Sequence, residues 1–134
     1  MSKIHVRSSD APAPAPFLSQ ATVVGNIVFC SGQLGVDPKT GKIVEGSVKD
    51  RTRQIIANLS AVLTASGSSL ADVAKVNVFL ADMNDFKDMN EAYMEGFPEP
   101  RPARTCVAVK TLPMGSDVEI ECSAVVTGPV KAKL

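Results

Sequence analysis

The sequence predicts one α+β domain in which two helices pack on one face of a mixed β-sheet. Two segments place apolar residues at helical spacing, and short segments rich in β-branched residues precede, separate and follow them. The resulting order of strands, helix, strand, helix and strands is typical of layered α+β domains. The 134 residues are enough for a single core, and no internal repeat suggests a second domain.

Residues 1–16 are predicted to form an extended N-terminal segment, with a short strand from Ile4 to Val6. The run from Ala11 to Pro16 alternates alanine with proline, so alternate φ angles are fixed and alternate backbone donors are missing. Such a run favours an extended loop.

A hairpin is expected next, because the strand-like segments Ala21 to Val24 and Ile27 to Cys30 meet at the turn-forming pair Gly25-Asn26. A second turn is predicted at residues 37–41, where Asp, Pro and Gly cluster. The first helix should span Val48 to Ser66, with Ser47 as N-cap and Gly67 at the C′ position.

A largely apolar strand is expected from Val73 to Leu80. A second helix should follow, marked by Phe86, Met89, Tyr93 and Phe97. Two more strands are predicted at Thr105 to Val109 and Val118 to Val126, and residues 129–134 form a C-terminal tail.

Composition excludes several classes of function. The 14 basic and 14 acidic residues cancel, and no stretch concentrates the Lys and Arg residues, which argues against nucleic-acid binding. The three cysteines and the single histidine are far apart in sequence and none lies in a C-x-x-C spacing, so no structural zinc site is expected, and no phosphate-binding or dinucleotide-binding glycine loop occurs. Neither a metal nor another cofactor is expected, and the three unpaired cysteines fit a reducing compartment.

The expected location is the cytoplasm, with a mitochondrial location left open. Residues 1–9 lack the apolar core of a signal peptide, and no segment approaches the ~20 apolar residues that span a bilayer, so no membrane association is expected. The final Ala132-Lys133-Leu134 is similar to the S-K-L type of peroxisomal signal. A match this short is more often coincidental.

Strand periodicity assigns the candidate polar residues to faces of the sheet. In the last strand, Val118, Ile120 and Cys122 should point toward the helices. Glu119 and Glu121 should then share the face that points away from them.

The same alternation puts Arg104 and Cys106 on one face of the preceding strand. The other face carries Thr105 and Val107, whose β-branched side chains suit a helix-covered core. Arg104, Cys106 and Glu119 are therefore expected to line one cleft on the face away from the helices.

Each of these residues has a functional and a structural interpretation. The rigid fork of donors on Arg104 suits a carboxylate, although most arginines are solvated or loosely paired. Glu119 is a candidate proton-transfer group or an exposed carboxylate. Cys106 is a candidate nucleophile, but a small packed cysteine is favoured, because a thiol with a pKa of ~8.5 needs a base or cation and His5 is distant in sequence.

Several segments together resemble the RidA family of imine and enamine deaminases. The resemblance extends in order and at similar spacing from Gln20 to Gly128. It rests on Cys30-Ser31-Gly32-Gln33, Val78 to Phe86, Arg101-Pro102-Ala103-Arg104-Thr105-Cys106, Leu112-Pro113 and Val118-Glu119-Ile120-Glu121.

The resemblance implies a fold, an assembly and an activity. The fold is the chorismate-mutase-like (bacillar) α+β fold, assembled as a homotrimer with three clefts between neighbouring subunits. The activity is hydrolysis of 2-imino acids such as 2-iminobutanoate and 2-iminopropanoate, and of enamines such as 2-aminoacrylate, to 2-keto acids and ammonia. The implied partners are these small molecules, and no cofactor is implied.

The resemblance also implies roles for individual residues. Arg104 would bind the substrate carboxylate, Glu119 would transfer protons and direct water, and Cys106 would complete the catalytic group. The implied substrate-binding residues are Arg104, Ser31, Gly32, Asn90, Phe17 and Leu18.

One position departs from the family pattern. Leu18 stands where the family often has a tyrosine. Either Phe17 replaces the packing of that ring, or a hydrogen bond worth ~0.5–1.5 kcal/mol is lost.

Alternative functions are a regulatory trimer that binds carboxylates without turnover, a ribonuclease or translation inhibitor, and a chaperone-like surface binder. Neutral charge and few aromatic residues disfavour the ribonuclease.

Overall fold

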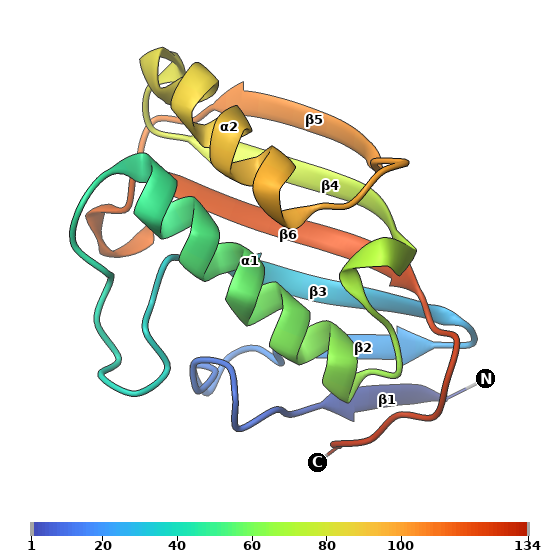
Figure 1. Ribbon diagram of the computed structural model, residues 1–134. Coiled ribbons are helices and arrows are strands. Elements are labelled where there is room, and N and C mark those ends of the chain that lie inside the picture. Colours follow the sequence, from blue (N-terminus) through green and yellow to red (C-terminus); the bar gives the residue numbers. More distant parts are fainter. Residues whose placement is uncertain (1, 134) are drawn as a thin grey trace.

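The computed structural model describes residues 2–133, and in it two α-helices cover one face of a six-stranded sheet (Figure 1). The predicted α+β layering is confirmed. The elements are β1 (Lys3–Val6), β2 (Ala21–Val24), β3 (Ile27–Gln33), α1 (Val48–Ala65), β4 (Val73–Leu80), α2 (Phe86–Gly96), β5 (Ala103–Ala108) and β6 (Val118–Val125).

The sheet is mixed, in the order β1-β2-β3-β6-β4-β5. Only β4 and β5 pair in parallel among the described strands, and α2 connects them, as parallel pairs require a crossover. The C-terminal strand β6 lies between β3 and β4 and pairs with both in antiparallel fashion. Strand β5 is therefore an edge strand.

The expected turns form as the sequence indicates. The β2–β3 hairpin turns at Gly25, whose φ of 61° lies in the left-handed region that glycine tolerates. The second turn closes with a hydrogen bond from the Gly41 N–H to the Asp37 carbonyl. Strand β3 continues past the predicted end at Cys30 to Gln33, through a bulge.

Helix α1 is capped at both ends as predicted. The Ser47 hydroxyl accepts the Lys49 N–H, and the Asp50 carboxylate accepts the Ser47 N–H, which makes a capping box. Ser66 is the C-cap, and Gly67 follows with a φ of 79°.

Helix α2 packs closely against α1 and the sheet. Met89 and Tyr93 are buried on its inner face, and Phe97 is buried just beyond its end. A Cβ atom added to Gly96 would lie 2.7 Å from the Ile56 Cγ2 atom of α1. The absence of a side chain at this position allows the two helices to approach each other.

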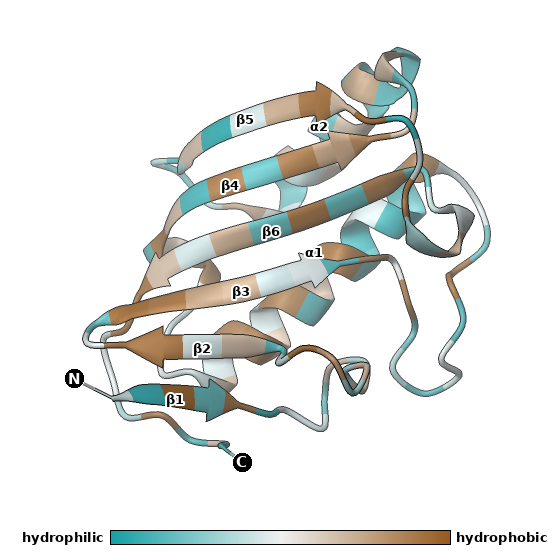
Figure 2. Ribbon diagram, turned by 180° about the vertical axis from the view of Figure 1, so that it is seen from behind, coloured by the Kyte–Doolittle hydropathy of each residue, from teal (hydrophilic) through white to brown (hydrophobic). Residues whose placement is uncertain are grey.

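The face of the sheet away from the helices, here called the open face, has no cover within residues 2–133 (Figure 2). Phe29, Val107 and Val125 on this face are 50%, 43% and 37% exposed. Apolar side chains on an uncovered face indicate a surface that binds a partner.

The N-terminal segment and the C-terminal tail are both bound to the domain. The Gln20 side chain accepts the Ser8 N–H and donates to the carbonyls of Ser8 and Pro12. In the tail, the Ala132 carbonyl accepts the Arg7 N–H. The last residue of the signal-like C-terminal tripeptide, Leu134, lies outside the described residues.

Neither described helix combines the length and the hydropathy that a membrane-crossing helix requires.

A buried amide holds the loop that follows β3. Asn58 on α1 is 1% exposed, and its Nδ2 donates to the carbonyls of Leu34 and Val36. Asn58→Ala removes this donor from both carbonyls, so we expect the free energy of unfolding in urea to fall by ~1–3 kcal/mol. Asn84→Ala, at an exposed position, is the control and should change it by less than ~0.5 kcal/mol. Equal effects of the two substitutions would contradict this role for Asn58.

Candidate functional site

Arg104 lies on the helix-covered face of the sheet, at the exposed edge formed by β5. Its backbone pairs with the buried Val76 of β4, which determines the side on which its side chain emerges. The guanidinium carbon is 4.7 Å from the centre of the Tyr93 ring and 5.7 Å from that of Phe86. The cation is therefore held by two aromatic faces of α2.

The expected orientation of Arg104 and Cys106 was wrong. They share one face, as predicted, but that face points toward α2, while Thr105 and Val107 point to the open face, where Lys75 donates to the Thr105 hydroxyl. β-branched side chains suggested a helix-covered core on the wrong side. Because β5 is an edge strand, its helix-covered face is close to solvent and can accommodate the charged Arg104. Val107 points to the open face, where it is 43% exposed and lacks a cover within the described chain.

The donors of Arg104 remain available to a ligand. Within residues 2–133 no carboxylate pairs with it, whereas Arg51 and Arg101 each bind one carboxylate and Arg53 binds two. A cavity of about 380 Å³ adjoins the guanidinium and is lined by Asn90, Tyr93, Met94, Arg101, Pro102 and Arg104. The Asn90 Oδ1 and Tyr93 hydroxyl atoms are buried there without a hydrogen-bond partner in the described part of the chain. A ligand or a second chain could satisfy both groups.

Cys106 is a half-buried side chain that packs against the core beside Arg104. Burial raises the pKa of its thiol, and the positive charge of Arg104 lowers it by a smaller amount. The thiolate is thus disfavoured at neutral pH, which supports a packing role rather than a nucleophilic one.

Glu119 and Glu121 lie on the open face, as predicted, between buried residues of β6. Asn77 of β4 donates a hydrogen bond to Glu121, and Glu119 has no such partner among residues 2–133. Burial raises the pKa of the Glu119 carboxyl, and repulsion from Glu121 adds to the increase. A raised pKa makes the protonated carboxyl accessible at a higher pH than in an exposed glutamate, which suits a group that transfers protons.

Gly32 brings the β3 backbone close to Glu119. A Cβ atom at position 32 would lie 2.9 Å from both the Cδ and the Oε2 atoms of Glu119. The backbone at Gly32 therefore approaches Glu119, the candidate proton-transfer group, more closely than a residue with a side chain would allow.

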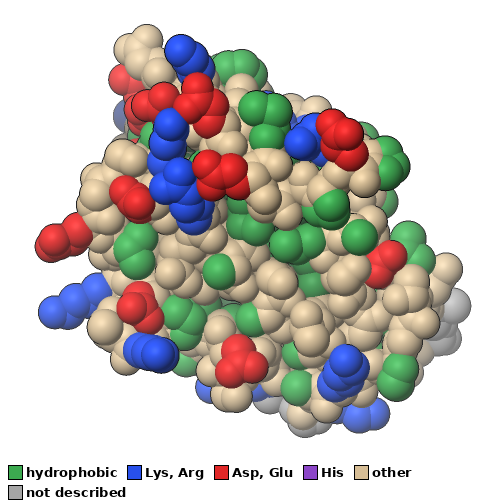
Figure 3. Space-filling view, viewed as in Figure 1, with side chains coloured by type: hydrophobic (Ala, Val, Ile, Leu, Met, Phe, Trp, Pro, Cys, Tyr) green, Lys and Arg blue, Asp and Glu red, His purple; other side chains and the backbone are tan. Residues whose placement is uncertain are grey.

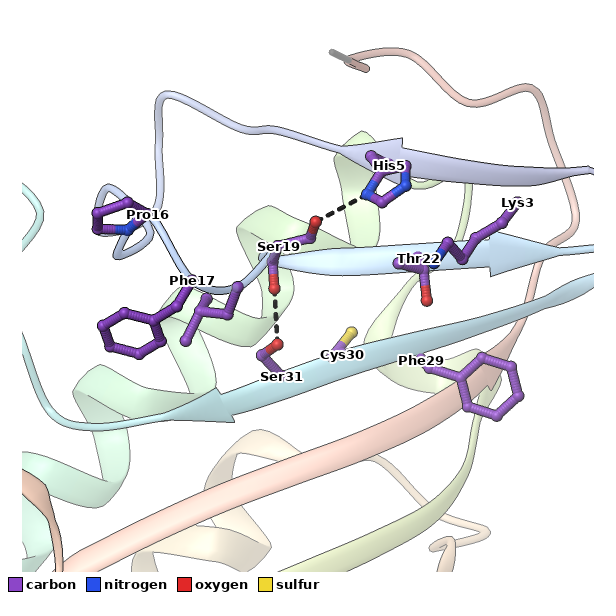
Figure 4. A pocket seen from close by; sticks show the side chains of 10 residues that line it. Lys3, His5, Pro16, Phe17, Ser19, Thr22, Phe29, Cys30 and Ser31 are labelled. Carbon is purple, nitrogen blue, oxygen red and sulfur yellow. Dashed lines mark hydrogen bonds between the residues drawn. The ribbon is translucent and has the colours of Figure 1, made fainter.

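Ser31, Phe17 and Leu18 border a second cavity, of about 600 Å³, on the open face (Figure 4). The Ser31 hydroxyl donates to the Ser19 carbonyl at 2.6 Å, and the Ser31 N–H donates to the Gln20 carbonyl at 2.9 Å. Ser31 is thus fixed in place. Phe17 is 86% exposed and Leu18 44% exposed, so both project from the surface.

The candidate residues form two clusters on opposite faces of the sheet. Arg104, Cys106 and Asn90 form the arginine cluster, and Glu119, Gly32, Ser31, Phe17 and Leu18 form the glutamate cluster. Sequence reasoning missed Tyr93 and Phe86, which hold the guanidinium. The helical spacing of Asn90 and Tyr93 was the available signal, since residues three apart share a helix face.

Comparison with known proteins identifies relatives along nearly the whole chain. The family described as Endoribonuclease L-PSP matches residues 8–126. A RutC family protein of Pyrococcus horikoshii is 51% identical over 117 residues, which cover 87% of this chain and 93% of that protein. A 2-iminobutanoate/2-iminopropanoate deaminase of Dermatophagoides farinae is 43% identical, over 87% of this chain and 91% of that protein.

Solved structures share the fold. RidA from the Antarctic bacterium Psychrobacter sp. superposes with a TM-score of 0.87 at 44% identity, over 90% of this chain and 98% of that one. Escherichia coli TdcF with bound serine gives a TM-score of 0.86 at 38% identity, over 90% and 97%. The fold expected from the resemblance is confirmed.

Relatives are found in several compartments. A Schizosaccharomyces pombe relative that is 48% identical is named as mitochondrial, and an Arabidopsis thaliana reactive intermediate deaminase that is 45% identical is named as chloroplastic. The cytoplasmic location expected from the sequence therefore stays a prediction.

The environments of the three cysteines predict low thiol reactivity. Cys30 and Cys122 are buried, and their mutual hydrogen bond together with burial raises the pKa of Cys30. With iodoacetamide at pH 7 we expect slow alkylation of the native protein. The alkylation rate should increase as pH rises, with Cys106 modified first, and all three cysteines should react rapidly in urea. Mass spectrometry identifies the modified residues. Fast modification of native Cys106 at pH 7 would restore the nucleophile hypothesis.

Proposed function

The chain belongs to the Endoribonuclease L-PSP family, which contains the RutC and RidA proteins, and from this we propose that it is an imine deaminase. It hydrolyses 2-imino acids, such as 2-iminobutanoate and 2-iminopropanoate, and enamines such as 2-aminoacrylate, to 2-keto acids and ammonia. Relatives named as a reactive intermediate deaminase and as an imine deaminase support this class of reaction.

The observation that carries the proposal is Arg104, which lies against two aromatic rings beside an open cavity and pairs with no carboxylate among residues 2–133. A guanidinium held in one orientation binds a carboxylate through two parallel charge-assisted hydrogen bonds. Every 2-imino acid carries a carboxylate next to its reacting carbon. The TdcF structure contains serine, whose α-carbon carries both a carboxylate and a nitrogen.

Glu119 supplies proton transfer in this mechanism. As a carboxylic acid it protonates the terminal carbon of the enamine, which gives the imine. The resulting carboxylate accepts a proton from the water that attacks C2, and this proton then moves to the nitrogen. Collapse of the carbinolamine forms the C=O bond, breaks the C–N bond to release ammonia, and returns the hydroxyl proton to the Glu119 carboxylate, which is again a carboxylic acid. The raised pKa of Glu119 suits both steps.

Both clusters act on one substrate only if a second chain brings them together. We therefore infer a homotrimer in which the arginine cluster of one chain meets the glutamate cluster of its neighbour, so that three clefts form. The exposed apolar residues of the open face support burial in such an interface. Neighbouring groups would also satisfy the unpartnered Asn90 and Tyr93 atoms.

The family description favours ribonuclease activity as a second candidate. The surface charges argue against it. On the helix side, basic and acidic side chains are interspersed (Figure 3), and Lys49, Arg51 and Arg53 are each paired with a carboxylate. Paired cations do not form the positive surface that RNA binding requires.

Arg104→Ala should strongly reduce imine hydrolysis. Hydrogen bonds to charged groups contribute ~1.5–3 kcal/mol, so kcat/KM should fall roughly 10- to 150-fold. The assay generates 2-iminopropanoate with an amino-acid oxidase and follows its loss in competition with semicarbazide. Arg53→Ala, which breaks the exposed pair with Glu95 on α2, is the matched control and should keep full activity.

Unchanged hydrolysis by the Arg104 variant would refute the carboxylate anchor. If the wild-type protein accelerates the loss of no imino acid, the deaminase proposal fails. A carboxylate-binding trimer without turnover then becomes the better description. The first explanation to test for the missing activity is the absent tyrosine hydroxyl at Leu18, which Leu18→Tyr would restore.

A charge on the open face should break the assembly. We expect the wild-type protein to show three times the chain mass of 14.1 kDa by light scattering. Val107→Glu places a carboxylate in the inferred interface, so it should yield monomers that retain helical circular dichroism and lose activity. Ala57→Glu, on the exposed side of α1, is the control and should remain trimeric and active. A fully active monomer would exclude a shared cleft.

A further inference from the structure

The cavity on the open face lies beside Ser31 and extends away from it across β3, β2 and β1. The register aligns His5 of β1 with Thr22 of β2, and Thr22 with Phe29 of β3. Lys3 lies two residues from His5 on the same face of β1. These side chains form a floor and a far wall that the catalytic mechanism above does not use (Figure 4).

The lining of this cavity is basic. It contains Lys3, His5 and the Thr22 hydroxyl, and no aspartate or glutamate among the described residues lines it. The Ser31 hydroxyl also borders it but already donates to the Ser19 carbonyl. The Nδ1 atom of His5 lies 2.8 Å from the Ser19 hydroxyl. When that hydroxyl donates to Nδ1, the neutral ring carries its proton on Nε2. A doubly protonated ring also carries a proton on Nε2, so Nε2 is a donor in both cases. Lys3 and the Nε2 atom of His5 are thus donors of the kind that suits anionic oxygens.

The cavity adjoins Glu119 through β3, because Ser31 lines it and the next residue, Gly32, contacts Glu119. At its other side Ser19 links Ser31 to His5, since its carbonyl accepts the Ser31 hydroxyl and its own hydroxyl contacts His5. A substrate with its C2 atom near Ser31 therefore has room to extend its side chain toward β1. The volume of about 600 Å³ is within the range of small-molecule sites and far exceeds what a methyl group needs.

We propose that this cavity is the side-chain subsite of the deaminase, and that Lys3 and His5 make it selective for an acidic side chain. The preferred substrates are then dicarboxylic 2-imino acids. Their first carboxylate binds Arg104, and their second binds Lys3 and His5. This inference rests on the proposed function, because it assigns the substrate class of the same site.

The test compares one dicarboxylic and one neutral substrate. 2-Iminosuccinate is generated from D-aspartate by D-aspartate oxidase, and 2-iminopropanoate from D-alanine by D-amino-acid oxidase, each with semicarbazide as competitor. We expect a higher kcat/KM for 2-iminosuccinate in the wild type. The double variant Lys3→Met/His5→Gln should lower that value about ten-fold or more and change the value for 2-iminopropanoate less than about two-fold.

Lys75→Met is the matched control, because Lys75 also lies on the open face but donates to Thr105 at the opposite edge of the sheet. It should leave the preference between the two substrates unchanged. Equal losses on both substrates in the double variant would overturn the subsite, because these residues would then only support Ser31. Equal kcat/KM values in the wild type would overturn it as well.

A binding measurement separates this inference from the proposed function. Calorimetry with 2-oxoglutarate and 2-oxobutanoate should show tighter binding of the dicarboxylate, lost selectively in Lys3→Met/His5→Gln. If neither imino acid is hydrolysed but this selectivity remains, the subsite is supported and the deaminase is refuted. If 2-iminopropanoate is hydrolysed and no dicarboxylate preference is found, the deaminase is supported and the subsite is refuted.

Discussion

Both helices of this protein pack on the same face of the sheet, and that one-sided cover determines where every candidate group lies. The covered face forms the core, in which the inward residues of β3, β4 and β6 meet α1 and α2. The open face retains apolar side chains such as Phe29 and Val107 in contact with solvent. A chain that buries only one side of its sheet has a surface for association, and its polar groups on that side become available to form a site between chains.

The arginine cluster depends on the edge of the covered face. Arg104 of the edge strand β5 lies against Phe86 and Tyr93 of α2 and also lines the adjacent cavity. Tyr93 and Phe86 restrict the guanidinium without neutralising it, because aromatic faces attract a cation but occupy none of its N–H donors. A charge that is held in place but unpaired is suited to recognise a carboxylate, since little conformational freedom is lost when the ligand binds.

The glutamate cluster depends on the centre of the sheet. Gly32 lies at a bulge of β3, so the backbone approaches Glu119 where any side chain would collide with the carboxylate. This contact helps to desolvate Glu119, and Glu121 two residues away adds like charge. Both effects favour the protonated form at a higher pH than for an exposed glutamate. The adjoining basic cavity lies on the β1 side of β3, away from these two carboxylates.

The sequence by itself determined the elements and the family. Period-two and helical spacing identified the strands and helices, Gly25, Ser47 and Gly67 marked their ends, and the motifs between Gln20 and Gly128 were enough to recognise the family. Tertiary structure alone decided which side of the sheet each candidate occupies. Strand alternation divides side chains into two sets but does not say which set meets the helices. For Arg104 this choice follows from pairing with Val76 across 28 residues of chain, a contact that no local pattern contains.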